Sequence, residues 1–183
     1  MPTARKLMTA EEFMALPEDD RRLELLDGEV VELAPPFGDH ARAEFRTAHH
    51  LFLHVQPLGG DVWTGAPAFI VQRNPDRVRA PDVCLFVAGR VPTREQRKHA
   101  LTIIPDLIVE VISPGDTATE VQQKTGEWLA AGARLVWNVY PVLQQVVAFR
   151  SLTDVRTYSS DDTLDAGPVL SGFACPVALL FEE

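Results

Sequence analysis

The stretch PDLIVEVISP, residues 105–114, constrains the fold most, because its pattern predicts a strand in the middle of a sheet. From Leu107 to Ile112 the residues are branched and apolar except for one, Glu110. An ionised carboxylate in such a place is costly unless a cationic group pairs with it or a metal ion is coordinated by it. Glu110 therefore needs a partner, and the rest of the chain has to supply one.

Two turn signals and two helical patterns organise the chain around this strand. Asp27-Gly28 predicts the tight turn of a hairpin in RLELLDGEVVELAP, and TAEEF has the spacing of a capping box at the start of a short helix. Apolar residues at helical spacing predict a helix over about 38–54. A second helix is predicted from about 117 to 131, where Gly132 ends it.

Short apolar segments supply further strands. They lie around the sequences DVWTGA, AFIVQ, PDVCLFVA, RLVWNVYP, QQVVAFRS and VRTYSS. The apolar tail GPVLSGFACPVALLF is predicted to fold back onto the core. This order predicts a single α/β domain over residues 1–183, with a mixed central sheet flanked by helices and an N-terminal hairpin.

Composition limits the partners and the surroundings. The net charge of −9 argues against indiscriminate wrapping of nucleic acid, since phosphate neutralisation dominates such binding. A nucleic-acid role then depends on metal ions or on a local basic patch. The apolar runs are too short to cross a bilayer, and the N-terminus lacks the apolar stretch of a signal peptide, so a cytoplasmic protein is expected. Cys84 and Cys175 are predicted to be buried free thiols.

Asp82, like Glu110, is a carboxylate that belongs to an apolar strand. It begins that strand directly after a proline. Successive strands are often neighbours, so the two carboxylates are expected at one edge of the sheet. Their mutual repulsion would be relieved by a divalent cation, and carboxylate oxygens suit Mg²⁺ or Mn²⁺. In the alternative interpretation, Glu110 lies at the end of the strand in water or pairs with an arginine.

The helix after this strand carries Glu120, Lys124 and Trp128 at intervals of four, which places them on one face. If that face lies against the strand, Lys124 brings a fixed positive charge to the carboxylates, as phosphoryl hydrolysis requires. The alternative is an exposed Glu-Lys pair of the kind common on helix surfaces.

Three segments, in their order and spacing, resemble the bacterial "putative restriction endonuclease" family, a branch of the PD-(D/E)XK nuclease superfamily. They are RAPDVCLFV, PDLIVEVISP and EVQQKTGEWLAAGARLVWNVYP. The opening hairpin RLELLDGEVVELAPP and the closing segment VLSGFACPVALLF are also similar to that family. The resemblance spans nearly the whole chain. It implies a restriction-endonuclease-like fold.

The resemblance also implies roles for single residues. Asp82 and Glu110 would bind Mg²⁺, together with the backbone carbonyl of Val111. The superfamily's lysine would fall at Ile112, but this branch takes it from the following helix, where Lys124 matches. Glu24 in the hairpin matches an additional acidic residue of the branch.

Three further positions are supporting candidates. His40 falls where the family has a histidine ahead of its first long helix, with a phosphate contact or a simple helix-start role as the two interpretations. Trp128 stands where the branch usually has tyrosine, and Glu120 replaces an aspartate. Tyr140 replaces the aspartate of a Val-Asp-Pro ending.

Other charged groups are open to two interpretations. His50 and His54 have a zinc-chelating interval on a helix, although ordinary helix histidines fit the apolar pattern better. Basic residues could form the local patch that an acidic nuclease needs, or could be solvated with salt partners. They are Arg73, Arg77, Arg79, Arg90, Arg94, Arg97 and Lys98.

The sequence thus predicts an Mg²⁺-dependent endonuclease acting on DNA, with Mn²⁺ as a second possible cation. The alternative is a catalytically inactive nuclease-like fold that binds nucleic acid or a partner protein. A homodimer or higher homo-oligomer is also expected, with the apolar tail and the edge strands near Val146 as contacts.

Overall fold

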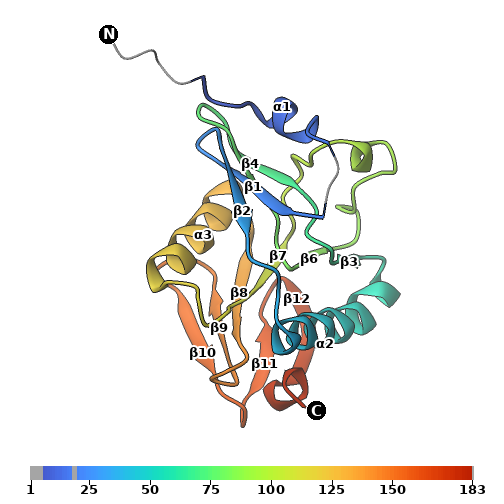
Figure 1. Ribbon diagram of the computed structural model, residues 1–183. Coiled ribbons are helices and arrows are strands. Elements are labelled where there is room, and N and C mark those ends of the chain that lie inside the picture. The colour runs from blue at the N-terminus through green and yellow to red at the C-terminus, as the bar shows by residue number, and fades with distance from the viewer. Residues whose placement is uncertain (1–5, 18–19, 183) are drawn as a thin grey trace.

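A six-stranded mixed sheet is the framework of the computed structural model, which describes residues 6–17 and 20–182 (Figure 1). Its strand order is β10-β9-β8-β7-β6-β3. The strands are β3 (Asp61–Trp63), β6 (Val83–Phe86), β7 (Leu107–Val111), β8 (Leu135–Tyr140), β9 (Gln145–Phe149) and β10 (Val155–Tyr158). β7 and β8 pair in parallel and the other neighbours are antiparallel, which confirms the predicted mixed sheet.

The predicted hairpin is confirmed, and two more strands extend it into a sheet of its own. Asp27 and Gly28 form its turn with φ angles of 50° and 78°. A Cβ at Gly28 would lie 2.5 Å from the Cβ of Leu7, so both conformation and space favour glycine there. The sheet has the order β2-β1-β5-β4. Its strands are β1 (Arg22–Leu26), β2 (Glu29–Leu33), β4 (Phe69–Gln72) and β5 (Arg77–Arg79).

The helices begin and end close to the predicted residues, and local caps mark the starts of α1 and α3. They are α1 (Ala10–Met14), α2 (Gly38–Val55) and α3 (Ala118–Ala131). Thr9 with Glu12 and Thr117 with Glu120 form complete capping boxes at α1 and α3. Gly132 ends α3 in the left-handed conformation. Short 3₁₀ turns occur at η1 (Gln56–Leu58), η2 (Gln96–Lys98) and η3 (Val177–Leu180).

The two long helices cover opposite faces of the six-stranded sheet, α3 beside β8 and α2 beside β12 in Figure 1. Side chains alternate between the faces along β7. Val109 and Val111 join the core that contains Leu51 of α2, whereas Ile108 joins the core that contains Trp128 of α3. Glu110 has the parity of Ile108, so its side chain points to the α3 face.

The C-terminal segment folds onto the core, as predicted. β11 (Thr163–Ala166) and β12 (Leu170–Pro176) form a hairpin whose apolar side chains join the core on the α2 face, as does η3. Val146 in β9 is completely buried in the same core. The buried side chains of Val146 and of the tail are therefore not free for an oligomer contact, whereas a contact through the edge strand β10 beside Val146 stays a prediction. The homo-oligomer itself stays a prediction.

Two smaller observations complete the fold. Cys84 and Cys175 are buried free thiols, as predicted. Over residues 6–17 and 20–182, none of the helices combines the length and the apolar character needed to span a bilayer.

Candidate active site and metal centre

Glu110 is a buried carboxylate held by two side chains of α3. Trp128 donates its Nε1–H to Oε1 at 2.7 Å, and Lys124 donates from Nζ to Oε2 at 2.9 Å. Burial raises the pKa of Glu110 to about 7; the charge of Lys124 opposes the rise, and the charges of Asp82 and Glu24 add to it. The alternatives of a water-exposed Glu110 and of an arginine partner are therefore wrong for this structure.

Lys124 lies between two carboxylates that come from different sheets. Its Nζ is 3.1 Å from Oε1 of Glu24 on β1, besides the contact with Glu110 on β7. Burial alone would lower the pKa of Lys124, but the surrounding carboxylates of Glu110, Glu24 and Asp82 hold it above its usual range. The lysine is therefore a fixed cation at this position.

Glu24 has only 1% of its surface exposed, and its charge is fully compensated. Its Oε2 accepts from Nη1 of Arg79 at 2.6 Å, and its Oε1 accepts from the backbone N–H of Ala80 at 3.1 Å. Burial favours the neutral acid, yet Lys124 and Arg79 outweigh burial and keep the pKa of Glu24 below its ordinary value. Glu24 is therefore an ionised ligand candidate.

Asp82 lies directly before β6, near the end of β7 that carries Glu110. Val83, the first residue of β6, pairs with Val109, which precedes Glu110. The backbone N–H of Val111 donates to Oδ2 of Asp82 at 2.8 Å. This contact fixes the carboxylate against the end of β7, where the metal ligands were predicted.

Two cationic or ionisable groups also contact Asp82. Arg22 places Nη2 at 3.0 Å from Oδ1, and His40 places Nε2 at 3.3 Å from Oδ2. Burial raises the pKa of Asp82, but the hydrogen bond and charge of His40, the charge of Lys124 and the Val111 amide lower it further than burial raises it. Asp82 is thus an anion in a largely dry setting.

His40 lies in the first turn of α2, close to a further carboxylate. One ligand atom each from His40, Glu44 and Asp82 can be chosen so that all lie within 4.8 Å of one another. The Nδ1 atom of His40 is buried and has no hydrogen-bond partner among the described residues. Burial lowers the pKa of His40, but Asp82 and Glu44 outweigh burial and raise it.

Glu120 is the predicted site residue that the structure does not bring to this centre. Its carboxylate accepts from the backbone N–H and the hydroxyl of Thr117, as the capping box requires, and the residue is exposed. Lys124 and Trp128, four and eight residues after Glu120, are the ones that contact Glu110. The predicted helical face is therefore occupied by Lys124 and Trp128.

Comparison with known proteins identifies the family of the chain. The family Uma2, described as "Putative restriction endonuclease", matches residues 10–178. The chain belongs to the Uma2 family. Its fold is shared by a solved structure from Anabaena variabilis, described as a "putative nuclease belonging to DUF820", with a TM-score of 0.81 and 22% identity over 95% of this chain and 97% of that one. Among curated proteins, no relative was found. Family and fold together support a nuclease.

In this Uma2 chain, a network of arginines fixes the hairpin sheet against α3. Arg79 contacts Glu24 with Nη1 and Oε2 of Glu127 with Nε, the latter at 2.7 Å. Arg77 pairs with Glu127 and, through Nη2 at 2.6 Å, with Asp27. Both arginines therefore hold the site together, and these carboxylates compensate their positive charges.

Most of the predicted basic patch is neutralised in the same way. Arg73 pairs with Glu11 and Asp76, Arg90 with Asp106, and Lys98 with Glu95. For these residues, the interpretation as solvated side chains with salt partners is the correct one.

Sequence reasoning missed four residues of this centre: Arg22, Glu44, Arg79 as a site residue, and Glu127. Spacing could have found two of them. Glu44 is four residues after His40 on one helix, and Arg22 is two residues before Glu24 on one strand. Arg79 and Glu127 carry no such signal, because their contact joins positions 48 residues apart.

The zinc interpretation of His50 and His54 has no support in the described part of the chain. His54 places Nε2 at 3.3 Å from the backbone carbonyl of Ser171, and no metal-capable group there includes either histidine.

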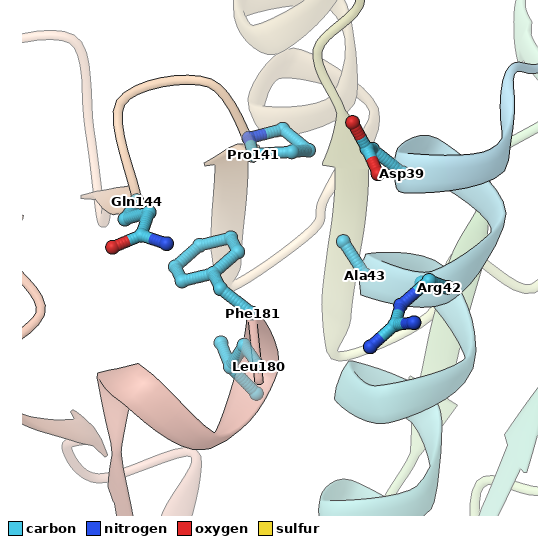
Figure 2. Close-up of a pocket in the computed structure, with 7 residues that line it drawn as sticks. All are labelled: Asp39, Arg42, Ala43, Pro141, Gln144, Leu180 and Phe181. Atoms are coloured by element: carbon cyan, nitrogen blue, oxygen red, sulfur yellow. The ribbon is translucent and has the colours of Figure 1, made fainter. Parts of the chain in front are cut away.

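Two hollows flank α2 and the hairpin. One, of about 230 Å³, lies between α2, the β8–β9 turn and η3, and Figure 2 shows its lining residues Asp39, Arg42, Ala43, Pro141, Gln144, Leu180 and Phe181. The other is an open groove of about 520 Å³ between α1 and the hairpin. Arg22 and Ala80 belong to the wall of this groove. Arg22 contacts Asp82 and the backbone N–H of Ala80 contacts Glu24, so the wall of the groove adjoins the acidic centre.

Proposed function

We propose that the chain is a metal-dependent endonuclease that hydrolyses phosphodiester bonds of DNA. The observation that carries the proposal is the position of Lys124, whose Nζ lies within 3.1 Å of carboxylates from both sheets. Asp82 lies directly before the adjoining strand β6, and its Oδ2 accepts from the backbone N–H of Val111, the residue after Glu110. Membership of the Uma2 family favours a nucleic acid over other phosphodiesters.

The donor atoms fit a hard divalent cation. Asp82, Glu110 and the backbone carbonyl of Val111 would hold it, with Glu24 as a further acidic residue. These donors are all oxygens, which suits Mg²⁺ and also Mn²⁺. Burial raises the pKa of Glu110 and the charges of Asp82 and Glu24 add to the rise, so a cation at this carboxylate would favour its ionised form. A cation bound there supplies Lewis-acid activation of the attacking water and offsets charge on the phosphate.

The protein's own groups do the positioning. Lys124 stands as a permanent positive charge beside the carboxylates, where it orients the attacking water or stabilises negative charge developing on the phosphate. Trp128 fixes one oxygen of Glu110, and Arg79 fixes one oxygen of Glu24. The groove beside Arg22 provides the approach for the phosphate backbone.

Cleavage of supercoiled plasmid in Mg²⁺ or Mn²⁺ tests the proposal. Asp82→Ala and Glu110→Ala should each lower the cleavage rate at least about 100-fold, since each removes a group on which the charge stabilisation depends. Glu95→Ala is the control, because this exposed glutamate pairs only with Lys98 among the contacts described. A double Asp82→Ala/Glu110→Ala protein that cuts at the wild-type rate would refute the assignment.

A second candidate function is a catalytically inactive fold that binds nucleic acid or a partner protein. The net charge of −9 and the ion-paired arginines favour it. Calorimetric titration with Mn²⁺ separates the two. Binding that disappears in Glu110→Ala supports the nuclease, whereas no binding at millimolar metal supports the inactive fold.

A further inference from the structure

We propose that the pocket between α2, the β8–β9 turn and η3 holds a guanine base of the DNA substrate, which is either unpaired or drawn out of its duplex by the apolar tip of that turn. The inference rests on the proposed function, because it names the form of substrate that the same protein would take. It concerns binding beside the acidic centre, so it can hold for a protein that does not cleave DNA.

The pocket adjoins the acidic centre on two sides. Asp39, in its wall, directly precedes His40, whose Nε2 lies 3.3 Å from Oδ2 of Asp82. On the sheet side, Pro141 comes three residues after the position on β8 that is level with Glu110, which is about 10 Å further along at the rise of a strand. The base of a nucleotide close to the scissile phosphate is therefore within reach of the pocket.

The size and the lining of the pocket fit one planar ring system. Its volume of about 230 Å³ is below the range of roughly 300–1,000 Å³ that is usual for small-molecule sites, which suits a single base. Figure 2 shows Phe181 and Pro141 on one side of it and Asp39 and Arg42 of α2 on the other. An aromatic side chain can stack with any base. The polar groups opposite then decide which base is held.

The two charged side chains carry the donor and acceptor pattern that guanine needs. Asp39 and Arg42 are three residues apart on α2, so they are neighbours on one helical face. A carboxylate accepts two hydrogen bonds, which matches the N1–H and N2–H donors of guanine, and a guanidinium donates to its O6 and N7. Adenine has an acceptor at N1 and a donor at N6, so it presents the wrong group to each side chain.

Both charged side chains are available to a ligand. Within residues 6–17 and 20–182, Asp39 has no side-chain hydrogen bond and no ion pair, and the one side-chain acceptor contact of Arg42 is with the backbone carbonyl of Glu182. That carbonyl is neutral, so it holds the guanidinium at the pocket without compensating its charge. Both residues are exposed, and the wall therefore offers an acceptor and a donor side by side.

The tip of the β8–β9 turn carries two large apolar side chains that the described part of the chain leaves uncovered. Val142 and Leu143 are 74% and 62% exposed. The N–H of Gln144 donates to the carbonyl of Pro141 at 3.2 Å, and the two strands are paired up to the turn, so the tip is fixed. Proteins that unstack DNA insert apolar side chains of this kind between base steps.

The tip and the pocket belong to the same turn, which joins the two observations. Pro141 and Gln144 line the pocket, and the exposed Val142 and Leu143 lie between them in the chain. An apolar pair that enters the base stack fills the space of a base that has left, and the adjoining pocket receives that base. Residues 135–149 include no Asp or Glu, so DNA can approach this turn in spite of the net charge of −9.

Fluorescence anisotropy with short DNA duplexes in Ca²⁺ tests the pocket, with gel electrophoresis to confirm that the DNA stays intact. A duplex with one unpaired guanine should bind about tenfold more tightly than the same duplex with an unpaired adenine. Asp39→Asn should remove this preference, because the NH₂ group of the amide would face a donor of guanine. Asp161→Asn is the matched control, since it removes the same charge from an exposed turn outside the pocket.

2-Aminopurine placed beside a paired guanine tests the tip, because the fluorescence of this base rises when it is unstacked. Binding of the wild-type protein should raise the fluorescence. The double variant Val142→Ser/Leu143→Ser should lose the rise and keep the preference for an unpaired guanine. Leu152→Ser is the control, because it changes an exposed leucine that follows the other end of β9. Circular dichroism of each variant confirms that it is folded.

The outcomes separate this inference from the proposed function. A preference for unpaired guanine that is lost in Asp39→Asn supports the pocket, even when no DNA is cleaved in Mg²⁺. Cleavage that depends on Glu110, with equal binding of unpaired guanine and adenine, overturns the pocket and leaves the nuclease intact. A preference that is unchanged in Asp39→Asn also overturns the pocket. An equal fluorescence rise in the wild-type and Val142→Ser/Leu143→Ser proteins overturns the role of the tip.

Discussion

Trp128 donates its indole N–H to Oε1 of Glu110 at 2.7 Å, so a completely buried aromatic residue of α3 fixes the carboxylate of β7. We expect Trp128→Phe to lower the free energy of unfolding beyond the cost of the smaller ring. The hydrogen bond to a charged group accounts for about 2 kcal/mol of this loss. Urea unfolding at pH 8, above the pKa of about 7 of Glu110, measures it.

Trp137→Phe is the matched control for this change. Trp137 is also completely buried, and it contacts one phenylalanine ring at 5.8 Å as Trp128 does at 5.9 Å. Its indole N–H has no partner among the described residues, so this substitution removes ring volume without a hydrogen bond. Equal losses in the two variants would show that the contact with Glu110 contributes nothing.

Lys124→Met should destabilise the metal-free protein by about 3 kcal/mol, because it leaves two buried carboxylates without their shared cation. Millimolar Mg²⁺ should then raise the melting temperature of the variant more than that of the wild-type protein. Lys98→Met is the control, because its pair with Glu95 lies on the surface, where ion pairs contribute little. A variant whose melting temperature does not respond to Mg²⁺ would contradict a cation site at Glu110.

Arg22→Gln should strengthen the binding of divalent cations about fivefold, because it removes a positive charge 3.0 Å from Asp82. Mn²⁺ titration in moderate salt measures the change. Arg21→Gln makes the same charge change one residue away, where the guanidinium faces Glu32 at 3.9 Å. If both variants bind Mn²⁺ equally, Arg22 does not compete with the cation.

Asp76→Asn tests a structural carboxylate far from the acidic centre. Asp76 accepts from the backbone N–H of Ala10 at 2.8 Å and from Arg73 at 2.7 Å. Burial raises its pKa, but the contacts with Ala10, Asn74 and Arg73 outweigh burial and lower it. Because the folded-state pKa is depressed, the stabilisation is present above the unfolded pKa of about 4 and is lost as the pH falls through the folded value.

We therefore expect Asp76→Asn to cost about 1–3 kcal/mol at pH 7 and much less at pH 3. Urea unfolding at both pH values measures this difference. Asp162→Asn, in an exposed turn where the carboxylate accepts from Ser159, should change the stability little. A loss at pH 3 as large as that at pH 7 would show that the charge of Asp76 is not responsible.

The sequence predicts those features that depend on neighbours along the chain. Asp27-Gly28 specifies a turn through its own backbone preferences, and the capping boxes of α1 and α3 need only four consecutive residues. The position of Asp82 near the end of β7 was within reach for a related reason, because β6 and β7 follow one another along the chain and are adjacent. These parts of the fold were predicted correctly, whereas the roles of the site residues stay predictions.

Long-range contacts explain what was missed. β4 and β5 extend the hairpin through the antiparallel pairing of β5 with β1, in which Leu25 is opposite Val78. No local sequence pattern predicts this pairing. The burial of Val146 likewise depends on the C-terminal hairpin that covers it, so a strand expected at an open edge is part of the core. Glu120 was wrongly assigned to the site because its spacing from Lys124 is compatible with the same helical face. Its position in the first turn of α3 instead makes it the capping partner of Thr117.

Because the acidic residues come from two different sheets, the geometry of the site depends on temperature. Glu24 is carried by the four-stranded sheet and Glu110 by the six-stranded one, and Lys124 touches both. Warming that loosens the smaller sheet would separate these carboxylates while most secondary structure persists. The proposed nuclease activity would then be lost at a lower temperature than the circular dichroism signal of the secondary structure.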